Sequence, residues 1–316
     1  MARPVMCWNL ERQPDTVVVV LIREGAEPDS PAVARLLLEA DDARVVSSAG
    51  IVHMRQTRPE RGRMIDLVAE VDGEVVATGA AGLNISTTTE GAAWAFVTVD
   101  SRARRQGIGD ALGAKLLEHL SMLHATKATS FFRWTEEGER WATARGWSRL
   151  LSGPLIAVDP RTVAEPSIPI GYRCVPMSQV TPESVYQAVR VAALDEPTPI
   201  QHDDIRLDDF LRDWNEPDAD LDSSTAVLDE DSNVVAFTFL NVAGERAQHG
   251  FTGTVPEHRG RGLATAAKRW ALRTAAQRGV TRVTTSNAEE NAAMRAINRK
   301  LGFEPIGEHV ILGRDL

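Results

Sequence analysis

The chain has 316 residues, 43% of them hydrophobic and 25% charged, a balance typical of a soluble globular protein with one large domain or two of ordinary size. Its formal net charge of -9 argues against a nucleic-acid partner, because such proteins usually carry a basic surface. The two cysteines, Cys7 and Cys174, are too few for a disulfide framework, and we expect a cytoplasmic protein.

Membrane and targeting segments are not expected. The longest apolar run, Val17 to Ile22, is far too short to cross a bilayer. Residues 1–14 mix charged and apolar side chains and lack the continuous apolar region of a signal peptide. We therefore expect no membrane partner.

The first half of the chain predicts a helix, a hairpin and then alternating strands and helices. Apolar residues recur at helical spacing after Pro31, and a hairpin over residues 64–83 turns at an Asp-Gly dipeptide. A strand over residues 93–99 leads into a glycine-containing loop and a helix. A strand over residues 129–134, another helix and a closing strand complete this half.

The second half predicts the same succession. Thr181 is a candidate N-cap with Pro182 at the first helical position, and a hairpin over residues 225–241 follows. Strands over residues 249–255 and 282–285 flank a second glycine loop with its helix. A further helix and a closing strand end this half.

The two glycine loops are copies of one pattern. VTVDSRARRQGIGDALGAKLL, residues 97–117, aligns with TGTVPEHRGRGLATAAKRWAL, residues 252–272. An offset close to half the chain length indicates a duplicated unit. An arginine, a glycine and a small residue recur 155 positions apart: Arg104 with Arg259, Gly107 with Gly262, and Gly109 with Ala264.

A glycine loop that leads directly into a helix favours an anion, most often phosphate. The first helical N–H groups have no intrahelical partner, and glycine lets the backbone approach a ligand closely. The loops lack the G-x-x-x-x-G-K-[ST] pattern of a P-loop. They also lack the third glycine of a dinucleotide-binding loop, because Leu112 and Thr265 stand in its place.

The pattern R-x-x-G-x-G/A between a strand and a helix resembles the pyrophosphate loop of the GNAT superfamily of acyl-CoA-dependent N-acyltransferases. The later Leu301-Gly302-Phe303 looks like the family's L-G-F corner, and the tandem layout is similar to that of mycothiol synthase. The two loops read Pro256-x-x-Arg259-x-x-Gly262-Leu263-Ala264 and, with Ser101 where proline is usual, Arg104-x-x-Gly107-Ile108-Gly109.

The resemblance implies an α/β fold (an α+β mixed sheet) built from two tandem GNAT-like domains. Each is expected to be a central mixed sheet flanked by about four helices and closed by its own last strand. The expected boundaries are residues 1–157, a proline-containing linker over residues 158–169, and residues 170–316.

The resemblance also implies where acetyl-CoA, the expected acyl donor, would bind, with no metal required. In the second half, the strand, the loop and two later asparagines are expected to contact it: Gly253, Thr254, Val255, Arg259, Gly260, Arg261, Gly262, Leu263, Ala264, Thr265, Asn287 and Asn291. The equivalents in the first half are Val97, Thr98, Val99, Arg104, Arg105, Gln106, Gly107, Ile108, Gly109 and Asp110.

In the family the acceptor amine attacks the thioester directly, and a backbone N–H of the strand before the loop stabilises the oxyanion. A base must take the ammonium proton, and the candidates here are Asp195, Glu196 and His249. Each has an alternative interpretation: the two acids could simply end a helix, and the histidine could lie in an exposed hairpin.

The tyrosine that often protonates the leaving thiolate in the family is replaced by Asn298 in the second half and Ala142 in the first. A thiol pKa of roughly 8.5 lets a thiolate leave without a dedicated acid. The first half also lacks counterparts of Asn287 and Asn291, so the chemistry is expected in the second half. The first half is expected to be structural or regulatory, with a loop that is still able to hold CoA.

Residues 203–222 contain nine acidic and two basic residues. They predict either a solvated amphipathic helix or an electrostatic funnel for a cationic acceptor. The expected partner is a small-molecule amine acceptor, bound by a monomer or homodimer. Two other functions stay open from the sequence: a non-catalytic CoA-binding scaffold, motivated by the missing tyrosine, and a GNAT-like acyl-CoA decarboxylase.

Overall fold

The computed structural model of the protein describes residues 7–10 and 18–316, so the expected absence of a signal peptide concerns a segment mostly outside the described residues. The first half contains four helices and seven strands in this part: β1 (Cys7–Leu10), β2 (Val18–Glu24), α1 (Ser30–Ala40), α2 (Ser48–Thr57), β3 (Ile65–Val71), β4 (Glu74–Leu83), β5 (Ala92–Val99), α3 (Ile108–Met122), β6 (Lys127–Arg133), α4 (Glu136–Thr143) and β7 (Ser148–Val158).

The second half repeats the order from its hairpin onward. Its described elements are β8 (Arg173–Pro176), α5 (Pro182–Ala193), α6 (Leu207–Trp214), β9 (Thr225–Leu228), β10 (Val234–Ala243), β11 (Arg246–Thr254), α7 (Leu263–Gln277), β12 (Arg282–Ser286), α8 (Ala292–Lys300) and β13 (Glu304–Asp315).

Local chemistry sets several of these boundaries as the sequence predicts. The side chain of Thr181 accepts a backbone N–H of the first turn of α5 at 3.4 Å. Asp72 and Gly73 have φ of 51° and 84°, the left-handed backbone that a tight hairpin between β3 and β4 requires. Gly279, with φ of 91°, follows the end of α7.

All the described strands join one sheet in the order β1-β2-β3-β4-β5-β6-β13-β7-β12-β11-β10-β9-β8. The pairs β5–β6 and β11–β12 are parallel, and the others are antiparallel. The mixed sheet and the repeated order of elements in the two halves confirm the predicted α/β fold class.

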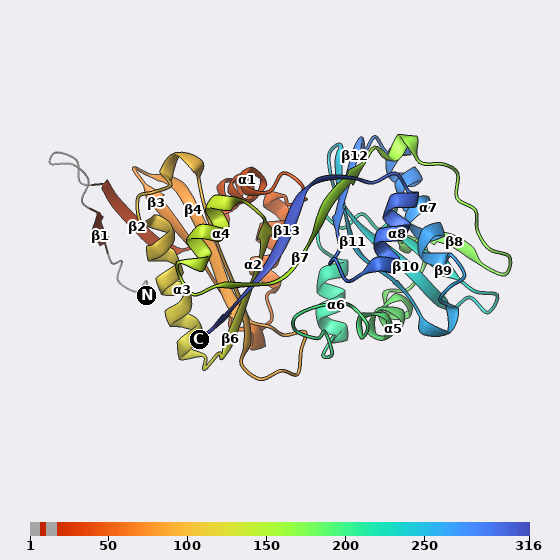
Figure 1. Ribbon diagram of the computed structural model, residues 1–316, viewed down its shortest axis with the longest axis horizontal. Helices are drawn as coiled ribbons and strands as arrows, with labels where there is room; N and C mark the ends of the chain where they lie inside the picture. Colours follow the sequence, from red (N-terminus) through yellow and green to blue (C-terminus); the bar gives the residue numbers. More distant parts are fainter. Residues whose placement is uncertain (1–6, 11–17) are drawn as a thin grey trace.

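The expectation that each half is closed by its own last strand is wrong. Residues 309–315 of β13 pair with β6 of the first half, and residues 155–158 of β7 pair with β12 of the second half. The two strands also pair with each other along most of their length. Figure 1 shows both strands running between the halves, with the C-terminus among the first-half elements. The division at residues 157 and 170 stays a prediction, because the sheet itself continues through this junction.

Both parallel pairs open into a fork. Only the first three residues of β5 pair with β6, and only Arg246 to Gln248 of β11 pair with β12. Beyond these residues the strands diverge. The β10–β11 register shifts between Thr238 and Leu240, a β-bulge next to the second fork, whereas the equivalent β4–β5 pairing is regular. The halves therefore differ at the place where the cofactor is expected.

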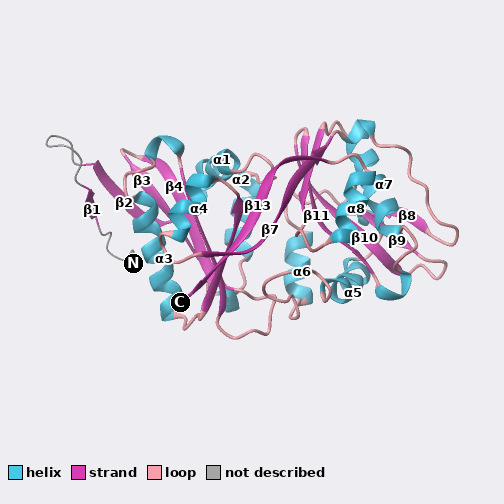
Figure 2. Ribbon diagram, viewed as in Figure 1, coloured by secondary structure: helices cyan, strands magenta, loops and turns pink. Residues whose placement is uncertain are grey.

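Helices cover both faces of the sheet (Figure 2). In the first half α3 packs on one face through Leu112 and Leu116, while α1 and α2 share a separate cluster on the other face around Val68. In the second half α7 packs on one face, and α5 with α6 covers the other around Phe237. This arrangement leaves the N-terminal ends of α3 and α7 beside the two forks.

The acidic segment, residues 203–222, lies against the first half. Asp209 on α6 is ion-paired with Arg61, and the Asp218 carboxylate accepts the backbone N–H of Ser47 at 2.8 Å. Phe210 is buried, as the amphipathic pattern predicts. These contacts favour the structural interpretation of the acidic run over a funnel.

Candidate functional site

The second-half cradle is the loop of residues 259–262 together with the first turn of α7. Gly260 and Gly262 have φ of 74° and 80°, and no atom lies within 4 Å of a Cβ added at either position. Gly262 is the N-cap of α7 and offers no side-chain acceptor, so the first N–H groups of the helix stay open. Successive N–H groups in such backbone form a concave anion site. The residues present therefore fit a pyrophosphate.

Two arginines flank this cradle. The Nε of Arg259 donates to the Thr254 carbonyl at 3.0 Å, and its Nη1 lies 2.6 Å from Asp195 Oδ2. Arg261 donates through Nη1 to the hydroxyl of Tyr172 at 2.6 Å, a neutral partner. Asp195, one of the predicted bases, thus lies on the cradle arginine.

The first-half cradle has the same backbone but different charges. Arg105 and Gly107 have φ of 61° and 75°, as at the equivalent glycines of the second half. However, Glu137 on α4 is ion-paired with Arg105 and with the neighbouring loop arginine, Arg104. Asp110, in the first turn of α3, occupies the position of Thr265. Two carboxylates therefore lie at this loop, Glu137 bound to the loop arginines and Asp110 bound to Arg145.

The strand residues predicted to contact acetyl-CoA lie beyond the last pair with β12: Gly253 and Thr254 on β11, and Val255 directly after it. The N–H of Val255 donates to the Val235 carbonyl of β10 at 2.9 Å, so it is not free. Backbone groups of an antiparallel strand alternate in direction, so those of Thr252 and Thr254 face the fork. At Gly253, an added Cβ would lie 2.7 Å from Ala192 of α5, which explains the glycine. Their first-half counterparts, Val97, Thr98 and Val99, lie beyond the other fork.

The predicted asparagines stand at the other side of the second fork. Asn287 directly follows β12, and its Oδ1 accepts the Nδ2–H of Asn298 at 2.6 Å. The side chain of Asn291 caps α8 by accepting the N–H of Met294 at 3.1 Å. Asn298, in the position where tyrosine is usual, is buried, and within residues 7–10 and 18–316 its Oδ1 has no hydrogen-bond partner.

A lysine and a histidine are buried together between α7, α8 and β11. Lys268 is 1% exposed, and its Nζ lies 5.5 Å from the ring centroid of Phe303. Burial lowers the pKa of Lys268 to about 7. Burial, and then the charge of Lys268, hold the pKa of His249 well below its ordinary value. His249 Nε2 has no hydrogen-bond partner among the described residues, and this predicted base is enclosed in the protein interior.

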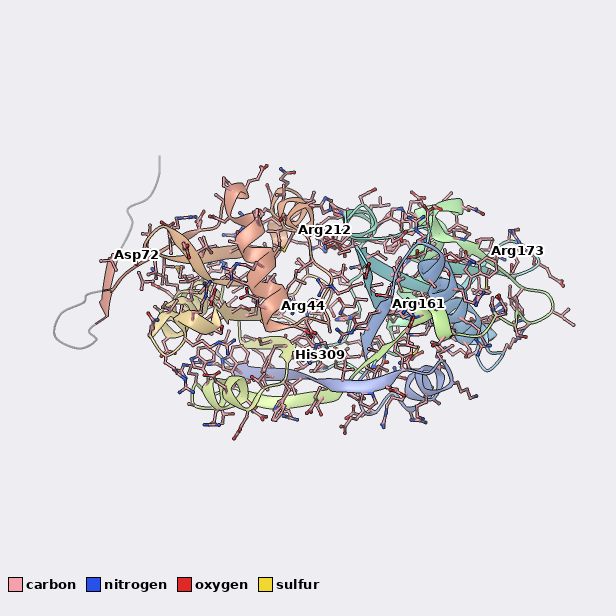
Figure 3. All side chains as sticks on the ribbon, turned by 90° about the horizontal axis from the view of Figure 1, so that it is seen from above. Arg44, Asp72, Arg161, Arg173, Arg212 and His309 are labelled. Carbon is pink, nitrogen blue, oxygen red and sulfur yellow. The ribbon has the colours of Figure 1, made fainter. Side chains whose placement is uncertain are left out.

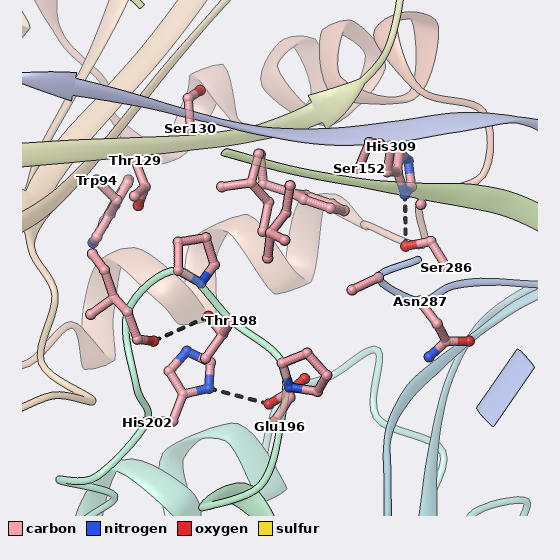
Figure 4. A pocket seen from close by; sticks show the side chains of 18 of the residues that line it. Trp94, Thr129, Ser130, Ser152, Glu196, Thr198, His202, Ser286, Asn287 and His309 are labelled. Atoms are coloured by element: carbon pink, nitrogen blue, oxygen red, sulfur yellow. Dashed lines mark hydrogen bonds and ion pairs between the residues drawn. The ribbon is translucent and has the colours of Figure 1, made fainter. Parts of the chain in front are cut away.

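A cavity of about 540 Å³ lies between the two halves. Aromatic residues of the first fork line it on one side, among them Trp94 and Phe131, and Asn287 of the second fork lines it on another. Figure 4 shows the segment that carries Glu196, Thr198 and His202 facing the strands across this cavity. Within the described chain, no residue of the acidic run 203–222 belongs to this lining.

The same pocket contains a hydrogen-bonded series that the sequence analysis missed. Asp41 lies in the turn after α1, and its Oδ2 is 2.8 Å from His309 Nε2. The other ring nitrogen, His309 Nδ1, is 3.0 Å from Ser286 Oγ. His309 and Ser286 both line the cavity (Figure 4). Seen from above in Figure 3, Arg44 and His309 both lie at the middle of the long axis, where the halves meet. No sequence signal connects these residues, because Asp41 and His309 are 268 positions apart.

The three predicted bases are therefore separated by the fold. Asp195 contacts Arg259 at the cradle, and His249 is buried beside Lys268. Of the three, Glu196 alone lines the cavity, where its carboxylate lies 3.3 Å from His202 Nδ1. Among the described residues there is no cluster of three or more His, Cys, Asp or Glu side chains arranged to hold a metal, and no helix long and apolar enough to cross a membrane.

Solved structures of known proteins match this architecture over nearly the whole chain. A GCN5-related N-acetyltransferase from Sphaerobacter thermophilus is 17% identical, with 94% of this chain and 95% of that chain covered and a TM-score of 0.69. A tandem GNAT protein from the clavulanic acid biosynthesis pathway is 23% identical, with 94% and 98% covered and a TM-score of 0.71. At these identities the likeness shows the fold alone.

Comparison with curated protein sequences finds no match. The family model for acetyltransferases of the GNAT family, in contrast, matches residues 34–142 and 188–303, one match around each cradle. These two matches cover more than half of the chain, and they show that the protein belongs to the acetyltransferase (GNAT) family, whose members use acyl-CoA donors.

Proposed function

We propose that the protein transfers an acyl group, acetyl in the simplest case, from acyl-CoA held by the second half to the nitrogen of a small amine held in the pocket between the halves. The observation that carries this proposal is the position of Asn287. It stands at the second fork, where the cofactor arm is expected, and it also lines the pocket. The donor cleft and the acceptor pocket thus meet at one residue.

The second half is the better donor site on charge and backbone grounds. In the second half only Arg259 of the two cradle arginines is paired with a carboxylate, Asp195, and Arg261 has a neutral partner. In the first half Glu137 pairs with both loop arginines, and the first turn of α3 carries Asp110. The backbone N–H of Thr254 faces the fork, where an N–H can stabilise the oxyanion of an acyl transfer. We therefore expect one CoA per chain.

The pocket walls indicate the kind of acceptor. Trp94, Phe96 and Phe131 offer flat apolar surface, and Pro197 and Pro199 face them from the segment after α5. The acidic run is engaged with the first half and does not enter the lining. A primary amine with an aromatic or apolar body therefore fits this pocket better than a polyamine or an amino sugar.

The test is the release of thiol from acetyl-CoA in the presence of tryptamine, phenethylamine, spermidine or glucosamine. We expect amine-dependent release, fastest with the aromatic amines. Release that is equal with and without every amine would contradict acyl transfer to nitrogen. Loss of carbon dioxide from malonyl-CoA without any amine would indicate a decarboxylase instead.

Matched glycine variants locate the donor site. Gly262→Val and Gly107→Val place the same side chain at equivalent N-caps with φ of 80° and 75°. The first should abolish CoA binding in calorimetry, and the second should leave it unchanged. Loss of CoA binding only in the Gly107 variant would assign the donor site to the first half, and loss in both variants would contradict a single donor site. As a control, each variant should unfold at the same temperature as the parent protein.

A further inference from the structure

Three polar side chains from three segments converge at the edge of the acceptor pocket. Asp41 follows α1 of the first half, Ser286 ends β12 of the second half, and His309 belongs to the exchanged strand β13. Both ring nitrogens of His309 are hydrogen-bonded, Nε2 to Asp41 Oδ2 at 2.8 Å and Nδ1 to Ser286 Oγ at 3.0 Å. A hydroxyl, an imidazole and a carboxylate in this order can move a proton away from a bound group.

The ionisation state of the Asp41 carboxylate determines which atoms donate and which accept in these hydrogen bonds. Asp41 also accepts the backbone N–H of Ala43 at 3.1 Å. Burial raises the pKa of Asp41, but the hydrogen bond and charge of His309, with smaller effects from Ala43 and Arg44, outweigh it and hold this pKa below its ordinary value. An ionised carboxylate only accepts, so His309 Nε2 carries a proton in both the charged and the neutral imidazole, and the neutral form has its unprotonated nitrogen at Nδ1. Nδ1 then accepts the O–H of Ser286.

This direction leaves the Ser286 oxygen with lone pairs that are free to accept a hydrogen from the pocket side. Ser286 lines the pocket and directly precedes Asn287 at the second fork. The His309 ring is only 2% exposed and contacts the Phe131 ring edge-on at 4.6 Å between centroids. The imidazole is therefore held in place and shielded from water, while the serine hydroxyl meets the acceptor.

We propose that Ser286, His309 and Asp41 form the proton relay of this site, in which Ser286 contacts the acceptor nitrogen, His309 takes its proton and Asp41 positions the imidazole. This inference rests on the proposed amine acylation. Ser286 accepts a proton from the ammonium as its own passes to His309 Nδ1. The nitrogen forms a bond to the acyl carbon, the carbon–sulfur bond breaks, and the second nitrogen proton goes to sulfur. An amide and a thiol result, and His309 returns its proton to water.

Other charged groups near this relay are already paired or lie across the pocket. Arg44 lies 3.8 Å from Asp41, and Arg133 on β6 and Arg282 on β12 are both ion-paired with Asp42. Strand β13 adds Glu308, bound to Arg149, and the facing residues of β7, Ser152 and Gly153, carry no charge. Glu196, the competing base, is paired with His202 on the opposite wall.

The decisive variant is Ser286→Ala, measured with acetyl-CoA and the most active amine of the panel. At pH 7 its kcat should fall about a hundredfold, within the usual range for general acid–base catalysis, with the KM for acetyl-CoA unchanged. The deficit should shrink toward pH 10, because an alkylamine with a pKa of about 10 then arrives without its extra proton. Ser148→Ala, outside the pocket, serves as the control and should retain parent kinetics.

A second readout needs no turnover. In the free protein, nitrogen NMR should find His309 protonated on Nε2 with a strongly hydrogen-bonded proton, and Asp41→Asn should remove that signal. A His309 protonated on Nδ1 would overturn the relay. A Ser286→Ala variant with the kcat of the parent, or with the same loss of kcat at pH 7 and at pH 10, would also overturn the relay. Neither result would contradict the proposed acylation of an amine. Absence of amine-dependent thiol release in the parent protein would reject both proposals together.

Discussion

Replacing Lys268 by methionine should stabilise the protein strongly at neutral pH, with a gain that depends on pH. Lys268 is buried between α7 and Phe303, and no carboxylate in the described part of the chain lowers the free energy of its charge. Methionine has a similar length, fills the same space and removes the ionisable group. The buried histidine beside it also loses a charged neighbour.

The size of the gain follows from the pKa of Lys268, which burial lowers from 10.5 to about 7. Between these values the unfolded chain binds a proton that the folded chain does not, so stability rises with pH. At 1.36 kcal/mol per pKa unit, the lysine costs about 4 kcal/mol at pH 7.5 and about 2 kcal/mol at pH 9. Below pH 7 the cost levels off near 5 kcal/mol, because the lysine is then charged in both states.

Urea unfolding of the parent and the Lys268→Met variant at pH 7.5 and pH 9 measures this difference. Lys300→Met, which removes an exposed lysine from α8, is the control and should show no pH-dependent gain. A gain that stays the same at the two pH values, or a variant less stable than the parent, would refute the reasoning. Either result would mean that Lys268 is well solvated or partnered.

Three further outcomes follow from the contacts described above. Glu216→Gln should raise the urea midpoint at pH 7.5 but not at pH 4. Burial and then neighbouring aspartates raise the pKa of Glu216. A carboxyl with a raised pKa loses its stabilising contribution as the pH rises. Replacing Asp208, Asp209 and Asp213 by asparagine should leave the salt dependence of kcat/KM unchanged, because Asp209 is engaged by Arg61; a flattened salt dependence would restore the funnel interpretation. Gly153→Ala should lower both the unfolding temperature and the activity, because its Cβ would collide with the Asn287 carbonyl, whereas Gly307→Ala, with its nearest atom 3.4 Å away, should be tolerated.

Much of the fold was accessible from the sequence because its signals are local and occur twice. The Asp-Gly turn, the N-cap at Thr181 and the two glycine loops each act through neighbouring backbone, so their spacing alone predicts their geometry. The exchange of β7 and β13 has no such signal. Both strands follow a helix and end a repeat, and the choice of sheet is made by tertiary contacts between halves.

Some residues of the candidate site could be predicted from the sequence, and others are brought together only by tertiary contacts. The cradle residues were predictable from spacing, whereas the relay joins Asp41 to His309 only because β13 crosses to the first half. Lys268 carried a visible signal that the sequence analysis did not use. It stands on the apolar stripe of α7 with Ala271, Leu272 and Ala275, at spacings of three, four and seven residues. A charged residue in such a stripe predicts a buried charge.

The exchange of closing strands also matters while the chain is being made. During synthesis β6 has no permanent neighbour on one edge until residues 309–315 leave the ribosome. At the usual rate of translation this interval lasts roughly 10 to 35 seconds. Throughout it β7, the strand that closes the same repeat, is within reach of that open edge. The nascent chain therefore has to keep β6 and β7 apart, or separate them again, before β13 arrives, and this competition makes the folding of the first half wait for the last residues of the second.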